Sequence, residues 1–93
     1  MSFDKNTVNV EGLVTLAPHY RADKSSVTFD ISSNYELKGV QKNVIIPIVS
    51  YGETAKAVLT KLTQGTKVYI MGMLRRDKEG NLIIAALEVL VEE

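Results

Sequence analysis

A small all-β barrel with one helix is the fold class that this sequence predicts, and three observations indicate it. Short apolar runs alternate with polar residues, as half-buried strands do. Single glycines interrupt these runs, where a strongly curved strand needs a bulge or a tight bend. One segment with helical spacing lies between the third and fourth strands. We expect the whole chain, residues 1–93, to form one domain.

The first expected strand covers residues 7–16. Val8 and Val10 alternate there with polar residues, and the apolar phase changes beyond Gly12. The pattern therefore predicts a bulge at this glycine. A polar loop follows at residues 19–26.

The second and third expected strands are residues 27–33 and 43–51, joined by a loop at 34–41. The second alternates clearly, and Phe29 shares its apolar face, which places this ring in the core. The third is apolar on both faces. Its Pro47 lacks a backbone donor, so it belongs at an unpaired edge or at a bulge.

A helix is expected over residues 53–63 because its apolar residues recur at helical spacing. These residues are Ala55, Val58, Leu59 and Leu62. The last two strands, residues 66–76 and 81–91, flank a hairpin turn at 77–80. Gly72 predicts a bulge or tight bend within the first of them.

The order of these elements is three strands, a helix and two strands. It predicts an OB-fold, which is a five-stranded, partly open Greek-key barrel, here with the helix between strands three and four. Another small α+β fold or an SH3-like barrel is the alternative.

Composition argues against several classes of function. The chain has no cysteine and a single histidine, His19, so it offers no thiol nucleophile, no cysteine-ligated metal, no histidine pair for a metal and no obvious serine–histidine–aspartate set. Its glycines occur singly, unlike those of nucleotide-binding loops. We therefore expect no enzymatic activity, no cofactor and no metal. No apolar run is long enough to span a membrane, and the N-terminus has no signal core, so we expect a cytoplasmic protein.

Charge is balanced over the whole chain but unevenly distributed. Residues 54–78 hold six cations and one acid, whereas residues 79–93 hold four acids and no cation. Such asymmetry either creates a basic surface on a neutral protein or leaves a solvated helix face beside an acidic tail.

Binding of a single nucleic-acid strand needs cations for phosphates and flat rings for bases. Candidates of both kinds lie in loops, within strands or at strand ends: Tyr20, Arg21, Lys24, Tyr35, Lys38, Lys42, Tyr51, Tyr69, Arg75, Arg76 and Lys78. Tyr35 is expected to be exposed in its polar loop. Tyr51 either stacks on a base or packs under the helix. Tyr69 alternates with Val68 and Ile70, so it faces away from them, toward a groove or a subunit interface.

Five segments, in correct order over residues 6–91, resemble the bacterial and phage single-stranded DNA-binding proteins. They are Asn6–Pro18, Val27–Ser33, Val49–Val58, Leu62–Arg75 and Gly80–Val91. The fourth is similar to the family's Leu-x-x-Gly-x-x-Val-Tyr-Val-x-Gly-x-Leu-Arg run.

The resemblance implies an OB-fold that binds single-stranded DNA by stacking and phosphate contacts, usually as a dimer or tetramer. Tyr51 matches a stacking aromatic before the helix, and Tyr35 lies near another stacking position. Arg21 matches a basic residue of the first loop. Tyr69 and Arg75 lie in the matching fourth strand.

The chain also departs from the family. An aromatic early in strand three is missing, Pro47 is unexpected there, and the long tail with an acidic tip is absent. The short, tailless form resembles instead the primosomal PriB proteins and small binding proteins of phages and mobile elements.

The sequence thus predicts a single-stranded DNA-binding protein with little sequence preference, acting in DNA replication, recombination or replication restart as a homodimer or homotetramer. The alternative is an OB-fold adaptor with weak DNA affinity that binds a replication or primosome protein through its apolar third strand. The residues of that surface would be Ile45, Ile46, Ile48 and Val49.

Overall fold

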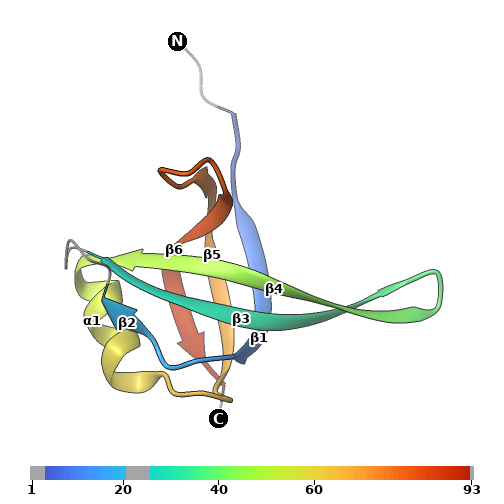
Figure 1. The fold of residues 1–93 in the computed structure, drawn as a ribbon, viewed down its shortest axis with the longest axis horizontal. Coiled ribbons are helices and arrows are strands. Elements are labelled where there is room, and N and C mark those ends of the chain that lie inside the picture. The colour runs from blue at the N-terminus through green and yellow to red at the C-terminus, as the bar shows by residue number, and fades with distance from the viewer. Residues whose placement is uncertain (1–3, 21–25, 93) are drawn as a thin grey trace.

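The structure is a computed structural model that describes residues 4–20 and 26–92. The predicted site residues Arg21 and Lys24 lie outside these residues. The described residues form six strands and one helix (Figure 1), with these bounds: β1 Val8–Val14, β2 His19–Tyr20, β3 Ser26–Leu37, β4 Val40–Tyr51, α1 Gly52–Lys61, β5 Lys67–Arg76 and β6 Leu82–Val91.

The five long strands close into a barrel because β1 pairs on both sides. It pairs with β5 along most of its length and with β3 at Leu13 and Val14, so the order around the barrel is β1-β5-β6-β4-β3. All of these pairs are antiparallel except β4–β6. The predicted fold class, an OB-fold with one helix between the third and fourth long strands, is confirmed. The short strand β2 joins the edge of β3 where only a polar loop was expected.

The core fills the barrel and continues under α1. Phe29 is buried with its neighbours on β3, as predicted. The helix contributes Ala55, Val58 and Leu62 to the same cluster, which confirms its apolar face. It ends at Lys61, two residues earlier than expected, and the Leu62 amide still donates to the Val58 carbonyl.

β3 and β4 continue beyond the barrel as a two-stranded ribbon, which Figure 1 shows extending away to one side. The loop expected at residues 34–41 is therefore wrong. Only Lys38 and Gly39 form the turn, and both have positive φ angles, of 52° and 80°, as a tight two-residue hairpin turn requires. The ribbon covers no core, so the apolar residues that share one of its faces stay exposed; they are Tyr35, Leu37, Val40 and Val44.

Two glycines mark places where backbones approach closely. The bulge predicted at Gly12 is wrong, because β1 pairs with β5 through this residue without a register shift. Glycine is required there because a Cβ atom would collide with the carbonyl oxygen of Ser32 on β3. The bulge predicted at Gly72 is confirmed: the β5–β6 register shifts beside it, with Leu87 of β6 as the extra residue.

Pro47 lies on an unpaired edge, one of its two expected positions. The carbonyl of its β3 neighbour, Asp30, accepts a hydrogen bond from the Thr15 amide and so points away from β4. Asp30 and Pro47 therefore form a non-hydrogen-bonded pair, and the proline nitrogen faces the opposite edge of β4. Pairing with β6 begins on that edge only at Ile48, so the missing donor interrupts no ladder.

Candidate nucleic-acid interface

The last residue of β4 and a residue near the end of β5 form a pair on the outer face of the barrel. The guanidinium carbon of Arg75 lies 5.6 Å from the centroid of the Tyr51 ring. Its Nη1 lies 3.3 Å from the phenolic oxygen of Tyr51, to which it donates a hydrogen bond. The tyrosine remains 43% exposed. Of its two expected environments, the structure therefore shows an exposed ring held by a cation–π contact, not a ring under the helix.

Around this pair the surface is hollow and basic. The cavity has a volume of about 130 Å³ and is lined by Ser26, Tyr51, Arg75, Arg76, Asp77, Lys78 and Ile83. Three cations and one acid thus surround one accessible aromatic ring. We call Tyr51, Arg75, Arg76 and Lys78 the barrel group.

The β5–β6 turn that carries Lys78 is held in shape by Asp77. Its Oδ1 accepts hydrogen bonds from the amides of Glu79, at 2.9 Å, and Asn81, at 2.8 Å. Arg76 donates from Nη1 to the Gly80 carbonyl at 2.7 Å, which ties this side chain to the same turn. The sequence predicted the turn but not this role of Asp77, although an aspartate at the start of a turn commonly accepts from amides two or more residues on.

A second set of predicted residues, Tyr35, Lys38 and Lys42, lies on the ribbon, and we call it the ribbon group. Tyr35 is 46% exposed, as expected, and pairs with Lys42 on the neighbouring strand. Tyr35 lies nine residues along β3 from Ser26, the partner of Tyr51, which corresponds to about 30 Å. An odd number of residues separates the two positions, so the pleat directs Tyr35 and Tyr51 to opposite faces of the ribbon.

The two remaining described tyrosines lie apart from both groups. Tyr69 faces away from the buried Val68 and Ile70, as predicted, and has Glu11 and Leu90 as its cross-strand neighbours. It shares the outer side of β5 with Arg75, at a distance of about 20 Å. Tyr20 on β2 is exposed, but it pairs with the core residue Val27 and so points to the face opposite Tyr51.

The surface expected for an adaptor is only partly available. Ile48 and Val49 are buried, at 1% and 0% exposure, because β6 pairs with β4 at these two residues. Ile46 is half-buried, and only Ile45 is well exposed. The prediction that all four residues form a docking surface is therefore wrong.

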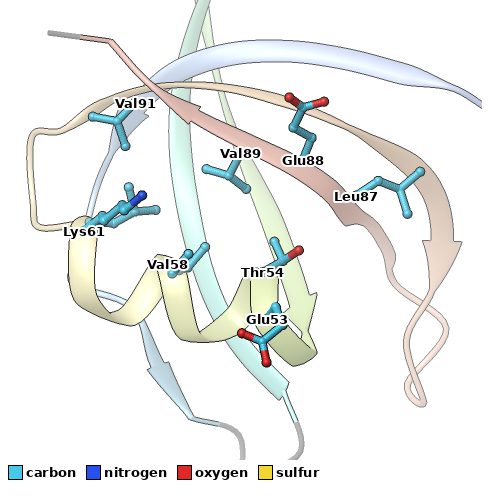
Figure 2. A pocket seen from close by; sticks show the side chains of 10 residues that line it. Glu53, Thr54, Val58, Lys61, Leu87, Glu88, Val89 and Val91 are labelled. Carbon is cyan, nitrogen blue, oxygen red and sulfur yellow. The ribbon is translucent and has the colours of Figure 1, made fainter.

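A further hollow lies between α1 and β6, with a volume of about 290 Å³. Figure 2 shows Val58 and Val89 facing each other across it, with Glu53 and Glu88 at its rim. Two carboxylates against the single lysine, Lys61, make this hollow unfavourable for a polyanion. It is therefore a poor candidate for the nucleic-acid site.

Other kinds of site find no support among the described residues. Residues 4–20 and 26–92 contain no cluster of three side chains able to hold a metal ion. In the same part of the chain, no helix has the length and apolarity needed to cross a membrane.

Comparison with known proteins adds a likeness of fold. No family model matches the sequence, and no curated protein matches it either. The structure is similar to the crystal structure of a small single-stranded DNA-binding protein from Streptomyces coelicolor, with a TM-score of 0.81. The likeness covers 98% of this chain and 96% of that chain at 18% sequence identity, so it establishes the shared fold.

Proposed function

We propose that this chain binds single-stranded DNA with little sequence preference and that the barrel group is its main contact. The observation that carries the proposal is the pair formed by Tyr51 and Arg75 at a hollow ringed with cations. The outer strand face of an OB-fold, beside the loop between its last two strands, is where such barrels bind oligonucleotides. The likeness to a small single-stranded DNA-binding protein supports the same function.

The chemistry of the barrel group suits a strand of any sequence. A base stacks on the exposed Tyr51 ring or on the guanidinium plane of Arg75, at about 1–3 kcal/mol per base. Arg76 and Lys78 neutralise the flanking phosphates. Ring faces and phosphates are common to all nucleotides, so little sequence preference follows.

The ribbon group provides a second contact for the same strand. The distance of about 30 Å between Tyr51 and Tyr35 corresponds to about nine stacked nucleotides at ~3.4 Å each. This length falls within the roughly 4–16 nucleotides that one OB-fold binds. The two tyrosines lie on opposite faces of the β3–β4 pair. A DNA strand that contacts both must therefore cross from one face to the other around an edge of this twisted pair.

The proposal extends to the other predicted residues and to the cellular role. Tyr20 on β2 and Tyr69 further along β5 offer additional contacts. Arg21 and Lys24, which lie outside the described residues, are proposed contacts on their sequence alone. We assign the protein to DNA replication, recombination or replication restart, with a role similar to that of PriB or of the binding proteins of mobile elements.

Fluorescence anisotropy tests the function directly. A labelled oligo-dT strand and a duplex of equal length are titrated at low and at physiological salt. We expect tight binding of the single strand alone, falling steeply as salt rises. Equal affinity for both, or no binding of either, contradicts the proposal, and a pull-down for a protein partner would then test the adaptor.

A further inference from the structure

One edge of β4 is open along the ribbon. β3 pairs with β4 from Val40 to Tyr51, but β6 pairs with the other edge only at Ile48 and Val49. Among the described residues no strand pairs with that edge between Val40 and Pro47. An open edge of this kind is a template for another extended chain.

The backbone groups on this edge follow from the alternation of the ladder. Pro47 is in a non-hydrogen-bonded pair with β3, so every second residue before it also directs its amide and carbonyl to the open edge. These residues are Ile45, Asn43 and Gln41. Together they present three donors and three acceptors, and Pro47 adds a carbonyl.

Two exposed apolar features lie at the ends of the same edge. At the ribbon tip, Leu37 and Val40 pair with each other and are 53% and 55% exposed. At the ribbon base lies an apolar hollow of about 350 Å³, where β4 separates from β6. It is lined by apolar side chains of β1, β4, β5 and β6, among them Val8, Ile45, Pro47, Leu74 and Leu82.

We propose that two copies of this chain form a dimer by pairing their β4 edges antiparallel about a two-fold axis at Asn43. In this register Gln41 of each copy pairs with Ile45 of the other, so all three donors and acceptors are satisfied on both chains. Pro47 then lies opposite Gly39, beyond the ladder. The apolar tip of each ribbon reaches the hollow at the base of the other, and one reciprocal contact covers both apolar features.

Neighbouring registers fit less well. An axis at Ile45 places Pro47 within the ladder, opposite Asn43, where no donor is available. The same axis sets Gln41 against Val49, whose edge already pairs with β6. An axis at Val44 sets Gln41 against Pro47, which has no donor. Axes at Lys42 and Gln41 set Ile45 against Gly39 and Leu37, both outside the partner's β4. Self-complementarity of the open edge therefore selects a second copy as the occupant and Asn43 as the centre.

Cysteine cross-linking tests the register, since the natural chain has no cysteine. A hydrogen-bonded antiparallel pair holds its Cα atoms about 5.5 Å apart, within the range that a disulfide spans. We expect the Asn43→Cys variant to form a covalent dimer under mild oxidation. The Gln41→Cys variant is its matched control, because the two copies of that residue lie about 14 Å apart. Equal cross-linking of both variants, or none of Asn43→Cys, would overturn the proposal.

Sedimentation measures the non-covalent dimer. We expect a dimeric mass for the unmodified chain and a dimer affinity about tenfold weaker for Leu37→Glu. Leu87→Glu is the control, because Leu87 is 58% exposed on the β6 bulge, outside the paired edge. A monomer at every concentration, or a dimer weakened equally by both changes, contradicts pairing through β4. Both measurements use the protein without nucleic acid, so they test the dimer independently of the proposed DNA binding.

Discussion

Arg75 covers the ring of Tyr51 and donates a hydrogen bond to its hydroxyl group, although the two residues lie on strands that do not pair with each other. The strand between them is β6, whose Ile83 pairs with Arg75 and lines the same hollow. The parallel β4–β6 pairing within the barrel therefore brings the aromatic residue and the cation into one site.

Removing the Tyr51 ring is expected to weaken binding of single-stranded DNA. Loss of one stacking platform costs about 1–3 kcal/mol, so Tyr51→Ala should raise the Kd of an oligo-dT strand by roughly tenfold or more. Tyr51→Phe keeps the ring and loses only the hydroxyl that accepts from Arg75, so we expect a smaller change. Anisotropy titrations compare the three proteins, and an unchanged Kd for Tyr51→Ala in a folded protein would remove this residue from the site.

The cations of the barrel group are expected to set the salt dependence of binding. Each phosphate contact to a single strand contributes about 0.7 to the slope of log K against log salt. Lys78→Ala should therefore lower that slope by about this amount. Lys56→Ala on α1 is the control, since Lys56 forms an exposed ion pair with Glu53 away from the hollow. Equal slopes for Lys78→Ala and the unmodified chain would contradict a phosphate contact at Lys78.

Much of the fold could be predicted because it depends on local patterns. The alternation around Phe29, the helical spacing up to Leu62 and the glycine beside the β5–β6 bulge all indicated their elements correctly. The ribbon could not be predicted, because β3 and β4 leave the barrel after residue 33 and cover no core there. The bulge predicted at Gly12 was wrong for a related reason. Glycine is needed there because the Ser32 carbonyl of another strand lies too close for a Cβ atom, and no local sequence pattern shows this contact.

The candidate site was predicted only as a set of residue types. The structure brings Tyr51 and Arg75 together, and it places Tyr35 about 30 Å away along the ribbon. Ser26 and Ile83 line the hollow solely because of strand order, so no signal in the sequence marks them. Which tyrosine lies near which cation depends on barrel closure, a property of the whole chain.

Gly72 is expected to be essential for stability. A Cβ atom there would collide with the Ala85 carbonyl oxygen on the neighbouring strand, and neither backbone can move freely inside the barrel. Gly72→Ala should lower the free energy of unfolding by about 3 kcal/mol. Gly80→Ala is the comparison: Gly80 has a φ of 86° in an open turn with no atom near its Cβ position, so about 1 kcal/mol of backbone strain is expected. Urea unfolding measures both, and a larger loss for Gly80→Ala would contradict this account of the barrel.

The contribution of Tyr35 is expected to depend on the length of the DNA. A strand of about five nucleotides that occupies the barrel group cannot also reach Tyr35, because the two sites are separated by about nine stacked nucleotides. Tyr35→Ala should therefore leave the affinity for such a short strand unchanged and weaken binding of a strand of about sixteen nucleotides by roughly tenfold. Tyr51→Ala should weaken binding of both lengths, since every strand uses the barrel group first. Titrating both variants with a series of oligo-dT lengths separates one continuous track from two unrelated contacts. If Tyr35→Ala weakens short and long strands equally, binding starts at the ribbon, and the assignment of the main contact to Tyr51 and Arg75 is wrong.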